Sequence, residues 1–204
     1  MYIEISGVRV HIGFPAAAVL AFLINGGRGE ALLFFLPAAA VHELTHLFFM
    51  RKYGCRTAEA EISPGGIRIS ADGFETLGYK RAAVCLLSAP AVNLLLAAAG
   101  FVVFRATGYE IAKNAASVNL ALGLINLLPM SFLDGGRAFS ALAGYYRDGG
   151  TERMQQITDT VCLIVAGTIG VYCAVLPGHN FSPVVFSLYC AFMTAIKHAA
   201  EKKD

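Results

Sequence analysis

A five-residue motif, His42-Glu-Leu-Thr-His46, lies inside an apolar stretch that covers residues 32–50. A helix turns once every ~3.6 residues, so the two imidazoles would project from one helix face about a turn apart. Two imidazoles placed in this way can bind one zinc ion, and Glu43 can act as a general base toward water. Because ionisable residues are costly within a membrane and usually functional there, the motif predicts metal-dependent hydrolysis in or just beneath a bilayer.

A catalytic zinc ion needs three protein ligands and an open position for water. Asp134 is the candidate for the third ligand, and it lies in the segment NLLPMSFLDGG, from Asn126 to Gly136. The same carboxylate could instead cap a helix that starts at Gly135, because Asp favours that position, and capping is compatible with metal binding. The sequence therefore predicts one zinc ion per chain, held by His42, His46 and Asp134.

The composition is that of a membrane protein. The 204 residues are 56% hydrophobic and 15% charged, with a mean hydropathy of +0.60, whereas soluble domains carry about 25% charge. A net charge of +2 is too small to indicate nucleic-acid binding. The five cysteines include no CxxC pair, and their odd number argues against a disulfide framework. They are expected to be packing residues, with Cys55 as an alternative zinc ligand.

The expected fold is an all-α polytopic membrane protein of about six transmembrane helices, with a small β-hairpin after the second. A full crossing needs about 20 apolar residues, so the second to fifth apolar segments are long enough, and the first and last are short. The six segments are residues 14–24, 32–50, 82–104, 115–133, 157–176 and 181–196.

Basic residues predict how these segments are oriented. Of the 16 lysines and arginines, only Arg28, Arg105 and Lys113 fall on one side of the expected topology. The positive-inside rule puts the other side, which includes both termini, in the cytoplasm. The HELTH motif and Asp134 would both lie near this cytoplasmic face of a multi-pass protein in the cell membrane.

The hairpin is expected on the same side. Pro64-Gly65-Gly66 is a turn signal, and it separates residues 58–63 from residues 67–70, which alternate in character. The segment could be a surface turn. It could also be a strand edge beside the metal, in which case Ile67 and Ile69 would lie where a substrate binds.

These motifs together resemble a known family. HExxH in one transmembrane helix, followed far downstream by NxxPxxxLDG, is similar to the site-2 protease family of intramembrane zinc metalloproteases, peptidase family M50. The segment from Ser88 to Asn93 also resembles that family's small-Pro-x-x-Asn motif. The expected single domain over residues 1–204, compact and without a PDZ insertion, is most similar to the sporulation branch. The expected absence of a CBS domain departs from that branch's best-known member. Phe132 departs from the family pattern, which often has a proline there.

The resemblance implies an intramembrane zinc metalloendopeptidase that cleaves a membrane-embedded or membrane-proximal protein segment and so releases a transcription regulator. The substrate would be a membrane-associated protein such as a sigma-factor precursor or an anti-sigma factor, and no nucleic acid would bind. Asn126 could hydrogen-bond the substrate or orient a loop. Asn93 could also contact the substrate, or it could join two helices through a hydrogen bond.

Two other classes of protein are compatible with parts of this pattern. A metal transporter would also place His, Asp and Glu in membrane helices, but it would need polar residues along the whole path, whereas these gather near one face. A catalytically silent relative could bind membrane clients, but it would be expected to lack Glu43 or a ligand. Glu43 and the expected ligands are all present here.

Overall fold

The computed structural model describes residues 2–5, 8–12, 29–63, 66–74, 76–146, 151–175 and 182–201. The chain divides into two compact units, Met1–Asn126 and Leu127–Asp204, which are described in turn. The first expected apolar segment, residues 14–24, lies outside the described residues. The assignment of residues 1–204 to a single domain stays a prediction.

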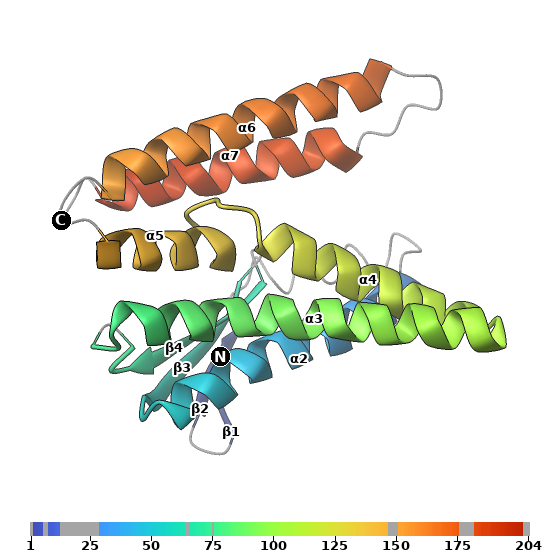
Figure 1. Cartoon of the computed structure of the whole chain (residues 1–204), viewed down its shortest axis with the longest axis horizontal. Coiled ribbons are helices and arrows are strands. Elements are labelled where there is room, and N and C mark those ends of the chain that lie inside the picture. Colours follow the sequence, from blue (N-terminus) through green and yellow to red (C-terminus); the bar gives the residue numbers. More distant parts are fainter. Residues whose placement is uncertain are drawn as a thin grey trace. The chain divides into compact units, whose positions relative to one another are not determined.

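Three helices form the apolar part of the first unit: α2 (Gly29–Lys52), α3 (Tyr79–Thr107) and α4 (Glu110–Asn126). Helix α3 packs against both α2 and α4 (Figure 1). Small residues let α3 and α4 approach closely, since a Cβ atom on Gly100 would lie 2.9 Å from the Cβ of Ala116. Such contacts hold helices together in lipid, where the hydrophobic effect between them is absent.

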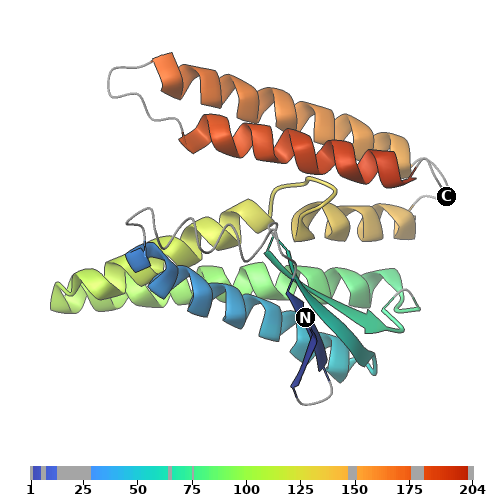
Figure 2. The same cartoon turned by 180° about the vertical axis from the view of Figure 1, so that it is seen from behind.

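A four-stranded sheet completes the first unit. Its strands are β1 (Tyr2–Ile5), β2 (Val8–Ile12), β3 (Arg56–Ser63) and β4 (Gly66–Asp72), in the order β1-β2-β3-β4. Strands β3 and β4 are antiparallel, and the two segments expected to form a hairpin lie within them. Both strands contact α2, the helix of the HELTH motif (Figure 2).

The sequence predicted an isolated hairpin, whereas the described sheet has four strands. The N-terminal strands β1 and β2 pair antiparallel with each other, and β2 pairs parallel with β3. The parallel pairing joins segments that are far apart in the sequence, and no local turn signal announces such a contact. The unit is therefore a helix layer with a mixed sheet.

The second unit contains α5 (Asp134–Tyr146), α6 (Thr151–Val175) and α7 (Ser182–Glu201). Helix α6 packs against both α5 and α7, and Ser187 on α7 donates a hydrogen bond to the carbonyl of Ala166 over 2.7 Å. A loop over residues 127–133 precedes α5.

This loop corrects one expectation. Residues 115–133 do not form one span, because α4 ends at Asn126. Pro129 lacks an N–H group and disfavours helical geometry at the residue before it, which accounts for the break. The residues after Asp134, between the expected segments 115–133 and 157–176, begin with the helix α5.

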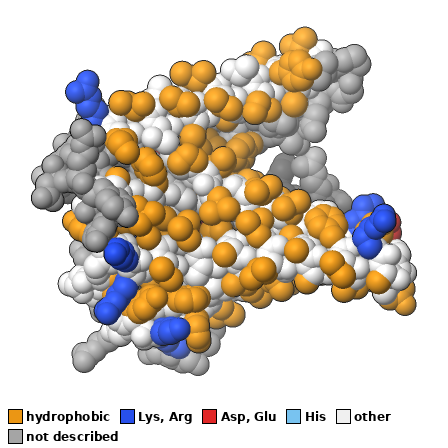
Figure 3. Space-filling model, viewed as in Figure 1, with side chains coloured by type: hydrophobic (Ala, Val, Ile, Leu, Met, Phe, Trp, Pro, Cys, Tyr) orange, Lys and Arg blue, Asp and Glu red, His pale blue; other side chains and the backbone are white. Residues whose placement is uncertain are grey.

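Three described helices are long and apolar enough to cross a membrane: Leu33–Lys52, Tyr79–Thr107 and Arg153–Cys173. Their outer faces expose large apolar side chains, among them Leu33 at 71% and Val102 at 68%. Figure 3 shows hydrophobic side chains along α3, with Lys and Arg at its two ends. The protein is therefore a membrane protein, while the number of six spans stays a prediction.

Candidate active site

The two histidines of the motif lie on one face of α2. His42 and His46 are 4% and 5% exposed, and their ring centroids are 4.9 Å apart with an interplanar angle of 86°. This is the arrangement expected from their spacing on a helix. Glu43, between them in sequence, is half-buried.

Each imidazole has an oxygen partner at Nδ1. The Nδ1 atom of His46 lies 2.9 Å from the backbone carbonyl oxygen of Cys85, and that of His42 lies 2.6 Å from Oδ1 of Asn93. A carbonyl oxygen can only accept a hydrogen bond, so Nδ1 must carry the proton in each case. In a neutral imidazole this leaves the lone pair on Nε2, which is the atom that can bind a metal ion.

Asn93 lies buried between helices. Its side chain is 0% exposed, and its oxygen accepts the hydrogen bond from His42. A role for Asn93 toward a substrate stays a prediction. The helix–helix hydrogen bond, the alternative for this residue, is what the structure contains. Asn93 on α3 is thereby a partner of His42 on α2.

Asp134 is the first residue of α5 and is buried. It is therefore helical itself rather than the cap of a helix that starts at Gly135. The negative carboxylate is favourable at a helix N-terminus, and Nη1 of Arg137 lies 4.0 Å from it. Glycine follows Asp134 because a Cβ on Gly135 would overlap the backbone carbonyl of Leu127. The start of α5 is thus pressed against the preceding loop.

Two residues of α6 hold this loop, and sequence reasoning missed both. Oδ1 of Asp159 accepts a hydrogen bond from the backbone N–H of Ser131 over 2.8 Å. Gln155 donates to the carbonyl of Pro129 over 3.2 Å and accepts from Ser140 over 2.6 Å. Asp159 is 0% exposed in an apolar helix, and an ionisable residue in such a segment is the signal that could have identified it.

The remaining residues of the NxxPxxxLDG segment pack within their own units. Asn126 is half-buried, and its Nδ2 donates to the carbonyl of Leu122 over 3.0 Å. Its role toward a substrate stays a prediction. Phe132, where the family often has proline, packs edge-to-face on Tyr189 with ring centroids 6.2 Å apart. The departure at this position is thus a packing contact with α7.

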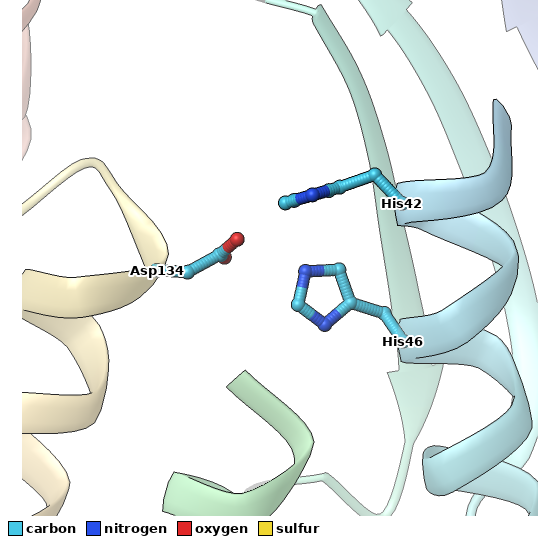
Figure 4. A group of neighbouring side chains, drawn as sticks. All are labelled: His42, His46 and Asp134. Atoms are coloured by element: carbon cyan, nitrogen blue, oxygen red, sulfur yellow. The ribbon is translucent and has the colours of Figure 1, made fainter. Parts of the chain in front are cut away.

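The three side chains expected to bind zinc are those of His42 and His46 on α2 and of Asp134 at the start of α5 (Figure 4). Two neutral imidazoles and one carboxylate are a donor set suited to zinc with an open coordination position. Cys55 was the alternative ligand. It packs with Met50 and Cys85, and burial raises the pKa of its thiol. A raised pKa disfavours the thiolate that zinc requires, so Cys55 is better explained as a packing residue.

The chain is similar to known zinc metalloproteases. Residues 104–168 match the model of peptidase family M50. The chain is 29% identical over 142 residues to a zinc metalloprotease of Methanocaldococcus jannaschii and covers 42% of its length. It is 34% identical over 137 residues to the zinc metalloprotease Rip3 of Mycobacterium tuberculosis and covers 33% of its length. These alignments take in 66% and 63% of the present chain.

The fold is also that of a solved structure. The site-2 protease from Methanocaldococcus jannaschii superposes with a TM-score of 0.70 at 18% identity, over 96% of the present chain and 93% of the other. The chain is thus similar in sequence to peptidase family M50 and to zinc metalloproteases, and similar in fold to a site-2 protease.

Proposed function

We propose that this protein is an intramembrane zinc metalloendopeptidase that cleaves the membrane-embedded or membrane-proximal segment of a protein substrate. The observation that carries the proposal is the pair of buried histidines on α2, each with an oxygen partner at Nδ1. An apolar helix that merely packed would not need two imidazoles held in the form that binds metal. Asp134 supplies the third donor of a catalytic zinc site.

Each residue of the proposed site has its own role in the reaction. His42, His46 and Asp134 would hold the zinc ion. Zinc, when bound, acts as a Lewis acid and lowers the pKa of water toward about 7. Glu43 takes the proton from water and passes it to the leaving amine. Asn126, at the end of α4, hydrogen-bonds the substrate backbone or orients the loop that follows it.

The substrate must also be made accessible. A transmembrane helix hides its peptide bonds in internal hydrogen bonds, and lipid penalises exposed backbone groups. Strand β4 is the last strand of the described sheet, and it contacts α2. We infer that residues 67–70 of β4, which include Ile67 and Ile69, pair with the extended substrate and replace the hydrogen bonds it loses.

The proposed reaction also implies a biological role for the protein. Cleavage near the membrane surface would release a transcription regulator, and the substrate class would be a sigma-factor precursor or an anti-sigma factor, as in the sporulation branch. The distribution of basic residues supports an active site and two termini on the cytoplasmic side. A gene for a membrane-tethered regulator beside the gene for this protein would support this assignment.

The test is cleavage of a helical membrane substrate by purified protein in lipid. The Glu43→Gln variant should keep its zinc and its fold and lose about 10²–10⁴-fold in rate, because the amide cannot accept the proton. Thr45→Ser, a conservative change in the same helix turn, is the control and should remain active. Cleavage by Glu43→Gln at the full rate would overturn the proposed mechanism.

A further inference from the structure

A chain of polar side chains crosses the three helices of the first unit behind His42. Nδ1 of His42 on α2 lies 2.6 Å from Oδ1 of Asn93 on α3. Nδ2 of Asn93 lies 2.8 Å from Oδ1 of Asn119 on α4, and Nδ2 of Asn119 lies 2.9 Å from the carbonyl oxygen of Ala115. Such a chain within apolar helices is costly unless every member is hydrogen-bonded. Asn119 belongs to none of the motifs identified in the sequence.

The direction of every hydrogen bond in this chain is set at its far end. The carbonyl of Ala115 can only accept, so Asn119 must direct its NH₂ group toward it and its Oδ1 toward Asn93. Asn93 must then donate from Nδ2, which also faces the carbonyl of Ala38 at 3.4 Å. Its oxygen is left to accept from His42, and Nδ1 of His42 must carry the proton.

The hydrogen bond at Nδ1 needs an outer residue to fix its direction at His42 but not at His46. The partner of His46 is the backbone carbonyl of Cys85, which cannot exchange its oxygen for a donor. The partner of His42 is a side-chain amide, which can rotate by 180°. A rotated Asn93 would present NH₂ to Nδ1, and His42 would have to shift its proton to Nε2, the atom needed for the metal.

We propose that Asn119 is a positioning residue of the metal site: it fixes the amide of Asn93 and thereby keeps Nε2 of His42 available for zinc. The inference rests on the proposed zinc site. Asn119 touches neither ion nor substrate, and it acts through Asn93. Outer partners of metal-binding histidines typically contribute about 10–100-fold in metal affinity.

The test uses three variants of the full chain purified in detergent. Asn119→Leu removes the acceptor at similar volume, whereas Asn119→Gln keeps both the amide oxygen and the amide NH₂ group. Asn114→Leu makes the same change at an exposed position of α4 and is the matched control. Zinc affinity is measured by competition with a chelator, and the imidazole tautomers of the zinc-free protein are measured by ¹⁵N NMR.

We expect Asn119→Leu to weaken zinc binding by about 10–100-fold and to populate the Nε2–H form of His42, while His46 stays in its Nδ1–H form. Asn119→Gln and Asn114→Leu should stay close to the wild type. Unchanged zinc affinity and an unchanged His42 tautomer in Asn119→Leu would overturn the proposal.

Two further outcomes are distinguishable. If the wild type binds no zinc, the proposed function fails, but the tautomer measurement still decides the role of Asn119. If leucine disturbs the packing of α4 on α3, Asn119→Ala removes the same acceptor without added volume. Equal zinc affinity and an unchanged His42 tautomer in a folded Asn119→Ala variant would equally overturn the proposal.

Discussion

The backbone N–H of Ser131 donates a hydrogen bond to Oδ1 of Asp159 over 2.8 Å, joining the loop before Asp134 to helix α6. Gln155 lies one turn earlier on α6 and bonds both Asp159 and the carbonyl of Pro129 in the same loop. Two polar side chains in the first half of α6 thus hold the segment that leads to the third proposed ligand.

Removal of this contact should loosen the loop. Asp159→Leu leaves the buried N–H of Ser131 without its acceptor, which should cost about 1–3 kcal/mol of stability. Asp159→Asn keeps an oxygen for the same bond and should cost less. Thermal unfolding in detergent measures the loss, and Thr168→Val at an exposed position of α6 is the control. If Asp159→Leu is as stable as that control, α6 does not hold the loop.

The glycines after Asp134 should not tolerate a side chain. A Cβ on Gly136 would overlap the backbone of Met130, and neither backbone segment can move as easily as a flexible side chain. Gly136→Ala should therefore destabilise the protein by about 1–3 kcal/mol, as overpacking typically does. Gly167→Ala in α6 meets no atom within 4 Å and should be neutral or slightly stabilising. Equal melting temperatures for the two variants would contradict the close contact.

Metal content should depend on all three proposed ligands. The wild type should bind about one zinc ion per chain, and replacement of His42, His46 or Asp134 by alanine should remove most of it. Elemental analysis of purified protein measures the ratio, and a chelator should abolish cleavage until zinc is restored. An Asp134→Ala protein with full zinc occupancy would show that the third ligand is a different residue.

Proline variants of β4 should distinguish its pairing with β3 from its proposed pairing with a substrate at the open edge. Successive residues of a strand direct their N–H groups to opposite sides, so one of Arg68→Pro and Ile69→Pro weakens pairing with β3 and the other removes only an edge donor. The variant that keeps the hairpin should keep zinc and lose cleavage. Helix-breaking residues near the scissile bond of a substrate should increase its rate. A fully active pair of variants would make β4 a surface feature only.

The charge distribution predicts that both termini are cytoplasmic. Reporter fusions at Met1 and Asp204 should be active only if the reporter functions in the cytoplasm. Single cysteines near Gly108 and Gly178 should react with an impermeant reagent added outside the cell. Labelling from outside near Gly149 would overturn the topology.

Local signals in the sequence predicted the histidine pair and the ranges of most described helices well. The spacing of His42 and His46 alone fixes their common face, and long apolar runs mark α2, α3 and α6. Non-local contacts were harder to predict. Nothing near β3 in sequence indicates its parallel partner β2, and apolarity alone did not reveal the break after Asn126 that Pro129 explains.

Non-local contacts were equally hard to predict in the candidate site. Asn93 was singled out by its motif, but its role depends on which polar atoms face it in space. His42 on one side and Asn119 on the other make it a link between helices rather than an exposed group. A sequence pattern identifies a chemically special residue more readily than it identifies the residue's partner.

The division of the chain at Asn126 has a consequence for biosynthesis. Asn93 and Cys85, the partners of the two imidazoles, belong to the first unit, as do the histidines themselves. The loop of Asp134 is bonded to α6 in the second unit. Because the N-terminal part of a chain leaves the ribosome first, the histidines can be oriented before Asp134 has been translated. The proposed zinc site therefore lacks its third ligand until translation has passed residue 134.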